Sequence, residues 1–178
     1  MKFAALVPLA VFLVLGGFFA LGLTKDPSAI KTQMIDRPVP DFTLTDLRDP
    51  AVSYTQDDLR GQISLLNVFG SWCTPCAVEH PVIVDIARQD VVRIVGVNWR
   101  DEREAGQAWL GRLGNPYDMV LFDDLSLLAI GIGVTGAPES YIVDASGTVR
   151  FKHTGMVTPQ VWRETMLPII NDLKKVAS

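Results

Sequence analysis

The chain has few of the residues that cross-link small domains or bind metals. Only two of its 178 residues are cysteines, and two are histidines. Both cysteines, Cys73 and Cys76, fall in one tetrapeptide, which excludes a framework of several disulfides. A bond between them would close so small a loop that it would remove little entropy from the unfolded chain. A purely structural disulfide is therefore disfavoured.

The residues that a zinc or haem site requires are also missing. Zinc usually takes four closely spaced Cys and His ligands, whereas His80 and His153 lie far apart in the sequence. Haem attachment needs a histidine directly after the second cysteine, where Ala77 stands. We expect no metal and no cofactor other than a redox-active disulfide. His80 is interpreted as a surface or helix-packing residue, and His153 as a strand-end residue.

Runs of basic residues, internal repeats and low-complexity segments are absent as well. The formal net charge is −4, and lysines and arginines form no cluster in the sequence. Nucleic acid is therefore not an expected partner. The length fits one domain plus an appendage, and a hydrophobic fraction of 48% suffices for a core.

Charged residues are missing from the amino-terminal region. The segment from Phe3 to Leu23 contains none, and its 21 residues, at ~1.5 Å each, would cross a hydrocarbon layer of ~30 Å. A cleavable signal peptide is the alternative, but Ala20-Leu21-Gly22 offers only a weak cleavage site. We favour an uncleaved transmembrane anchor over residues 1–23, with Lys2 on the cytoplasmic side, although Lys25 weakens the charge asymmetry.

The remainder of the chain is expected to be exported. Residues 24–38 are polar and contain prolines, which suits an extended linker, and a folded domain is predicted over residues 39–178. Exported domains often use cysteines as cross-links, yet this one has a single closely spaced pair. That scarcity indicates catalysis rather than stabilisation.

The cysteines lie where a predicted strand gives way to a predicted helix. The nearly continuous apolar run from Ile63 to Phe69 is typical of a strand buried on both faces, and a helix is predicted from Thr74 to Gln89. A further strand from Val91 to Asn98 completes a βαβ unit. The other expected elements are a hairpin (41–45 and 52–55), a helix (101–113), a strand (119–122), a short helix (125–130), two strands (140–143 and 148–151) and a final helix (158–175) interrupted or bent near Pro168.

A Cys-x-x-Cys pair beside a βαβ unit indicates thiol-disulfide chemistry on a thioredoxin-like α/β fold. We expect a central mixed sheet flanked by helices, an N-terminal hairpin and a central αβ insert. A cysteine at a helix amino terminus is favoured as a thiolate, which makes Cys73 the candidate nucleophile. Cys76, one turn later, can then attack the Cys73 sulfur and resolve a mixed disulfide.

The residues around the nucleophile are candidates for contact with a substrate. Trp72 precedes Cys73 directly, so we expect it to shield the edge of the site and to present apolar surface, although a core aromatic is the simpler alternative. Thr74 and Pro75 begin the helix, and the missing N–H of Pro75 costs nothing there. Asn98, Trp99 and Arg100 follow a buried strand and are second-rank candidates for the rim of the site.

Two motifs together carry a family resemblance. Residues 70–76 read GSWCTPC and residues 133–139 read GVTGAPE, with RPVPDF at 37–42 and GVNW at 96–99. From about Arg37 to its carboxyl end, the chain resembles the cytochrome c maturation thioredoxins of the CcmG/DsbE family. The central insert, which lengthens the connection between the two motifs, is similar to the insert of those anchored proteins.

The resemblance implies roles for further residues. Pro138 would be a cis proline facing the disulfide, and the backbone of Ala137 would pair with an extended substrate segment. Glu79 and Glu139 would belong to the surroundings of the active site. A carboxylate there would oppose thiolate formation and could accept or deliver the proton of Cys76. The alternative for Glu79 is a solvated residue on the helix surface.

The resemblance also implies a pathway. The protein would be a single-pass protein of the bacterial inner membrane with its catalytic domain in the periplasm. It would act as a reductant on the CxxCH disulfides of apocytochrome c or on a maturation partner. Electrons would come from a membrane reductase of the DsbD/CcdA type. The residues themselves do not determine this direction, because it depends on the reduction potentials of the pair and its partners.

Three other functions remain open from the sequence. The first is a general exported thioredoxin-like reductase or oxidase with other clients. The second is a copper metallochaperone, since related folds bind Cu(I) through two cysteines and a distant histidine, although their spacing resembles C-x-x-x-C. A peroxidase is less favoured, because its attacking cysteine would be expected without a partner three residues away.

Overall fold

The computed structural model describes residues 6–23 and 34–177. The chain divides into two compact units, residues 1–31 and residues 32–178. In the first unit, helix α1 (Leu6–Leu23) carries no charged side chain. Among the described residues, no helix is both long enough and apolar enough to cross a membrane. Residues 3–5 of the expected span lie outside them.

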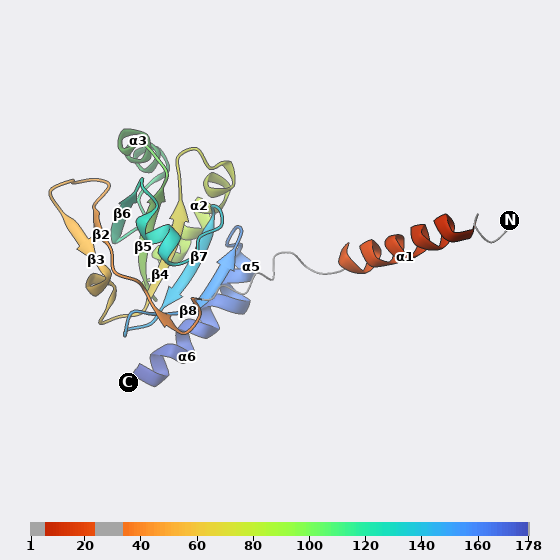
Figure 1. Ribbon diagram of the computed structural model, residues 1–178. Helices are drawn as coiled ribbons and strands as arrows, with labels where there is room; N and C mark the ends of the chain where they lie inside the picture. Colours follow the sequence, from red (N-terminus) through yellow and green to blue (C-terminus); the bar gives the residue numbers. More distant parts are fainter. Residues whose placement is uncertain (1–5, 24–33, 178) are drawn as a thin grey trace. The chain divides into compact units, whose positions relative to one another are not determined.

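The second unit is built on a mixed sheet of six strands, in the order β1-β8-β7-β4-β5-β6 (Figure 1). Strands β4, β5 and β6 run parallel, while β7 and β8 join antiparallel on the other side of β4. The expected thioredoxin-like arrangement, a central mixed sheet flanked by helices, is thus confirmed. The bounds of the strands are β4 Ser64–Phe69, β5 Arg93–Trp99, β6 Met119–Asp123, β7 Glu139–Val143 and β8 Thr148–Thr154.

The amino-terminal part of this unit adds a separate hairpin. Strands β2 (Thr43–Thr45) and β3 (Ser53–Thr55) pair antiparallel, and a short 3-10 helix, η1 (Gln56–Leu59), follows them. The expected linker extended to residue 38, but Arg37 and Pro38 form strand β1 and pair with β8. The folded unit therefore begins before Val39, because the backbone of this segment completes the edge of the main sheet.

The helices of the second unit connect or follow the strands of the main sheet. After β4 comes α2 (Thr74–Ala87), and after β5 comes α3 (Arg103–Leu113). Between β6 and β7 lies the short helix α4 (Leu127–Gly131). The segment that contains α3 and β6 is the expected central insert, and β6 extends the parallel side of the sheet by pairing with β5.

The final helix is interrupted near Pro168, one of the two outcomes predicted for it. The chain forms α5 (Pro159–Val161), a π-helical turn (Trp162–Met166) and α6 (Leu167–Ala177). Proline has no N–H, and its ring clashes with the carbonyl four residues earlier. The turn before Pro168 adopts the wider spacing, in which the N–H of Leu167 reaches the carbonyl of Trp162.

Strand β4 separates two hydrophobic cores because alternate side chains point to opposite faces of a sheet. Leu65 and Phe69 belong to the core beneath α2, α3 and α6. Leu66 and Val68 belong to the other core, which is closed by α4 and residues of the N-terminal hairpin. By the same alternation, Asn67 points to the α2 face. This polar side chain in a buried strand lies beneath the helix that carries the cysteines.

Candidate active site

The two cysteines form a disulfide where the chain leaves the carboxyl end of β4 and enters α2. Their Cα atoms are 5.3 Å apart. Cys73 caps the amino terminus of α2, and its Sγ accepts a hydrogen bond from the backbone N–H of Cys76 at 3.2 Å. Thr74 and Pro75 occupy the first positions of the helix. Both cysteine side chains are largely buried, so a partner must approach through the loops around them.

Trp72 is fixed to the neighbouring loop by its indole nitrogen. Its Nε1–H lies 2.9 Å from the carbonyl oxygen of Arg100 and 3.2 Å from that of Trp99. The two tryptophan rings are 5.9 Å apart, and the side chain of Trp72 remains 52% exposed. A Cβ at Gly70 would lie 2.5 Å from the indole nitrogen, so glycine makes room for this ring. Two of the second-rank residues, Trp99 and Arg100, therefore border the site.

Asp101 also connects the loops that follow β4 and β5. This residue was not predicted from the sequence as part of the site. Its carboxylate accepts hydrogen bonds from both the N–H and the hydroxyl of Ser71, each at 2.6 Å. The amide of Asn98 donates a third at 2.7 Å, and the N–H of Glu102 a fourth at 2.9 Å. The sequence does place this aspartate just beyond the carboxyl end of the buried strand β5, whose end lies beside the end of β4. That position was the signal that could have identified it.

Glu79 follows Cys76 by three residues in α2, and both side chains are buried on the same face of the helix. Its side chain is only 3% exposed, which excludes the solvated alternative. Burial raises the pKa of Glu79 to about 7, although two donors partly oppose the shift. These donors are the N–H of Val157, at 3.0 Å from Oε2, and the amide of Asn67, at 2.6 Å from Oε1.

Asn67 in turn is hydrogen-bonded to two further side chains, those of Ser140 and Tyr117. This cluster was not predicted from the sequence. Nδ2 of Asn67 also lies 3.1 Å from Oγ of Ser140, while its Oδ1 accepts a hydrogen bond from the hydroxyl of Tyr117 at 2.8 Å. These residues come from β4, β7 and the segment before β6. Only a polar residue within the apolar run of β4 hinted at them.

The segment from Gly133 to Pro138 leads into β7, and its Ala137–Pro138 peptide bond is cis. The carbonyl of Pro138 accepts a hydrogen bond from the N–H of Gly155 at 3.0 Å. Gly155 lies in the same β8–α5 connection as Val157, which contacts Glu79. The β8–α5 connection thus contacts both Pro138 and Glu79.

Glu139 differs from the expectation that both glutamates surround the sulfurs. Along β7, Ser140 and Ile142 point toward α2, whereas Glu139 points to the other face together with Tyr141. The side chain of Glu139 therefore lies on the sheet face opposite α2. Its carboxylate is fully buried and lies 3.0 Å from Nζ of Lys152 and 2.7 Å from the hydroxyl of Tyr141. The backbone N–H and the hydroxyl of Thr135 also donate to it. These contacts join Glu139 to the segment before Pro138 rather than to the disulfide.

The two histidines have ordinary structural surroundings. His80 is buried, and its Nε2 lies 2.9 Å from the carbonyl oxygen of Gly114. Its ring packs on that of Trp109 at 4.5 Å, which confirms the helix-packing interpretation, and burial lowers its pKa. His153 lies in β8, near its end. Among the described residues, no group of three or more His, Cys, Asp or Glu side chains is placed to hold a metal.

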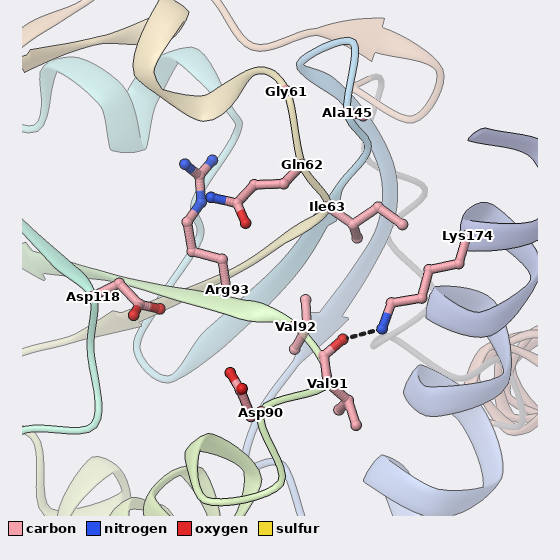
Figure 2. Close-up of a pocket in the computed structure, with 10 residues that line it drawn as sticks. All are labelled: Gly61, Gln62, Ile63, Asp90, Val91, Val92, Arg93, Asp118, Ala145 and Lys174. Carbon is pink, nitrogen blue, oxygen red and sulfur yellow. Dashed lines mark hydrogen bonds between the residues drawn. The ribbon is translucent and has the colours of Figure 1, made fainter. Parts of the chain in front are cut away.

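A cavity of about 530 Å³ lies at the opposite end of the sheet (Figure 2). It is lined by residues that precede or begin β4 and β5, together with Asp118 before β6, Ala145 between β7 and β8, and Lys174 of α6. Lys174 donates to the carbonyl of Val91, and Arg93 donates to Ser64 Oγ and to the carbonyl of Asp58. The cysteines follow the other end of β4, so this cavity is separate from the disulfide site.

The amino-acid sequence is similar to a family model and to named thiol:disulfide interchange proteins. The Redoxin family model matches residues 34–166. The thiol:disulfide interchange protein DsbE of Allochromatium vinosum is 45% identical, over 93% of this chain and 92% of its own length. DsbE of Pseudomonas aeruginosa is 42% identical over 94% and 93%, and DsbE of Escherichia coli K12 is 36% identical over 97% and 96%.

Solved structures agree on the fold. A secreted thiol-disulfide isomerase from Corynebacterium glutamicum matches with a TM-score of 0.62 and 22% identity, over 75% of this chain and 85% of that one. A DsbF homologue from Corynebacterium diphtheriae matches with a TM-score of 0.64 and 22% identity, over 83% and 96%. Together with the disulfide at the start of α2, the near-complete match to the curated relatives decides the assignment. The chain belongs to the DsbE (CcmG) family and is a thiol-disulfide oxidoreductase whose redox centre is the Cys73–Cys76 pair.

Proposed function

We propose that this protein is a membrane-anchored reductant of cytochrome c maturation, which passes two electrons from Cys73 and Cys76 to a client disulfide. The observation that carries the proposal is the placement of the disulfide at the helix start with a buried glutamate behind it. This arrangement supplies an attacking sulfur, a resolving sulfur and a proton acceptor in one site.

The first step uses the reduced pair. The thiolate of Cys73 attacks one sulfur of the client disulfide, so that a Cys73–client bond forms and the client S–S bond breaks. The second client sulfur leaves as a thiolate and takes a proton from water. Unpaired N–H groups at the start of α2 stabilise the negative charge on Cys73, one of them being that of Cys76.

The second step releases the client. Cys76 loses its proton and attacks the Cys73 sulfur, so that the Cys73–Cys76 bond forms and the Cys73–client bond breaks. The client sulfur leaves as a thiolate and takes a proton from water, which completes the client dithiol. We assign the acceptance of the Cys76 proton to Glu79, which lies three residues after Cys76 on the same buried face of α2. A carboxyl group with a pKa of about 7 can take up and return a proton near neutral pH.

The segment before Pro138 is assigned to client binding. The backbone of Ala137 would pair with an extended client segment as an added strand, which demands little of the client's sequence. Trp72, Thr74 and Pro75 would contact the client beside it, and the exposed half of the Trp72 ring supplies apolar surface. Glu139 would hold the binding segment in place through Thr135 rather than transfer protons.

The family assignment and the sequence support a proposal for the localisation. Residues 1–23 would anchor the protein in the bacterial inner membrane, residues 24–38 would act mainly as a linker, and the catalytic domain would lie in the periplasm. The support is the uncharged run of 21 residues from Phe3 to Leu23. Extraction of membranes with alkaline carbonate tests the anchor, because release of the uncleaved protein into the soluble fraction would contradict it.

The clients can be identified by trapping. In a Cys76→Ser variant the second step is blocked, so mixed disulfides on Cys73 should accumulate and be recovered by affinity purification. We expect apocytochrome c or a cytochrome-maturation thiol protein, and a DsbD/CcdA-type reductase as the electron donor. A Cys73→Ser, Cys76→Ser double variant is the matched control. Efficient capture of unrelated clients alone would instead favour a general exported reductase.

A further inference from the structure

The buried amide of Asn67 has no freedom to reorient while all of its partners are present. A carboxamide has one acceptor oxygen and two N–H donors. Oδ1 accepts from the hydroxyl of Tyr117 at 2.8 Å, and Nδ2 donates to Oε1 of Glu79 at 2.6 Å and to Oγ of Ser140 at 3.1 Å. If the amide were flipped, its oxygen would face the carboxylate of Glu79.

Tyr117 is itself held rigidly. Its ring is buried and stacks on Phe69 with centroids 5.1 Å apart. It also lies directly over Gly96, where an added Cβ would approach the ring to 2.9 Å. Gly96 is the sheet partner of Asn67, so the hydroxyl is fixed beside the amide. Tyr117 comes from the segment between α3 and β6, within the insert that lengthens this domain.

We propose that Tyr117 is a positioning residue for thiol exchange, whose hydroxyl locks the amide of Asn67 with its N–H toward Glu79. The lock directs the Asn67 amide at Oε1 of Glu79, while the backbone N–H of Val157 independently donates to Oε2 at 3.0 Å. A proton on Glu79 must then occupy a lone pair directed away from both donors. The proposal rests on the proposed role of Glu79 as the proton acceptor for Cys76.

The surroundings of Glu79 contain few other titratable groups. Cys76 lies on its own helix, and His80, the next residue, is turned toward Gly114 and Trp109. Strand β4 contributes the neutral amide of Asn67, β7 the hydroxyl of Ser140, and the segment before β6 the phenol of Tyr117. The β8–α5 connection contributes the backbone of Val157. The balance between the ionised and neutral forms of Glu79 therefore depends on neutral donors, and the lock orients one of them, the amide of Asn67.

The direct test is Tyr117→Phe, which keeps the ring and removes the lock. Carbon-13 NMR of the carboxyl groups, recorded on the oxidised full chain, measures the titration of Glu79. We expect its midpoint to rise by roughly half a pH unit, since the amide loses the hydroxyl that polarises and orients it. Asn67→Leu removes the donor itself and should raise the midpoint by about one to two pH units. Tyr54→Phe, in the hairpin, is the matched control and should leave it unchanged.

A second readout connects the lock to the reaction. The pH profile for resolution of a mixed disulfide between Cys73 and a small aromatic thiol should shift in the same direction in Tyr117→Phe. An unchanged carboxyl titration in Tyr117→Phe would overturn the lock, even if Asn67→Leu fails to fold. An unchanged profile in Glu79→Gln would instead remove the proposed role of Glu79, and the NMR titration would still report on the lock.

Discussion

At the scale of single residues, the two buried glutamates differ in the partners that surround them. Within the described part of the chain, Glu79 forms no salt bridge and its pKa is raised by burial, whereas Glu139 is paired with Lys152. A carboxylate that is paired and fully hydrogen-bonded serves to fix its neighbours, while one with only neutral donors can exchange a proton near neutral pH. The sheet face to which each side chain points decides between these tasks.

The raised pKa of Glu79 makes the stability of the oxidised protein depend on pH. The pKa is about 7 in the folded state and about 4.5 ordinarily, so the folded state holds the proton more tightly. The stabilising contribution is complete below pH 4.5 and is lost as the pH rises to about 7. The loss is on the order of 3 kcal/mol.

Denaturant unfolding between pH 4.5 and 8 measures this dependence. Glu79→Gln should lack that part of the decline, because a glutamine does not titrate, while the contributions of all other groups remain. Equal slopes for the two proteins would show that Glu79 titrates normally in the folded state.

The Lys152–Glu139 pair provides a second prediction. Lys152→Met leaves the buried carboxylate without its cation and should lower the free energy of unfolding by about 3–5 kcal/mol. The double variant Lys152→Met, Glu139→Gln removes both charges and should recover most of that loss. Arg88→Met, which breaks an exposed pair with Asp85, should cost less than about 1 kcal/mol. Losses that simply add in the double variant would contradict the coupling.

At the scale of elements, the site is an edge where the loops after β4 and β5 meet. Asp101 fastens the two loops through Ser71 and Asn98, and Trp72 crosses between them to the carbonyls of Trp99 and Arg100. Parallel neighbours place their carboxyl ends at the same edge of a sheet, so residues that are 30 positions apart become direct partners. Cys73 is therefore positioned by the following βα connection as well as by its own helix.

Asp101→Ala should loosen the connection before Cys73. The variant loses hydrogen bonds from the N–H and the hydroxyl of Ser71, and we expect a destabilisation of roughly 2 kcal/mol. Hydrogen exchange of the Ser71 amide should accelerate by about tenfold or more, because its acceptor is gone. Asp172→Ala, in an exposed pair on α6, is the control that should change neither quantity appreciably. Unaltered exchange at Ser71 would show that the loop is held by other contacts.

The predicted elements were mostly right where the sequence pattern itself specifies the structure. The buried run of β4 and the helix start at Cys73 follow from hydrophobicity and from Pro75. The π-helical turn before Pro168 was missed, because the choice between bending and widening depends on how Trp162 and Met166 pack in the core. Strand β1 was missed because two residues carry no periodicity and pair only once β8 exists.

At the scale of the whole molecule, residues 32–178 contain both hydrophobic cores. A chain that begins at Thr32 should therefore fold with a free energy of unfolding within about 1 kcal/mol of that of the full protein. It should also reduce a small disulfide at the same rate in solution. Circular dichroism during denaturation and a standard disulfide reduction assay measure both. A clear loss of stability would mean that residues 1–31 contribute to the folded unit.

The sequence by itself determined the reaction class, since two cysteines three residues apart at a strand-to-helix junction leave few alternatives. The succession of a buried-strand pattern, a helix pattern and a second buried-strand pattern also determined the βαβ unit. Only the tertiary structure decided which glutamate lies behind the cysteines, because that depends on which face of β7 and of α2 is turned inward. It also brought Asn67, Tyr117 and Asp101 to the site. These residues lie on separate elements, and no local pattern records which buried polar groups will meet when those elements pack.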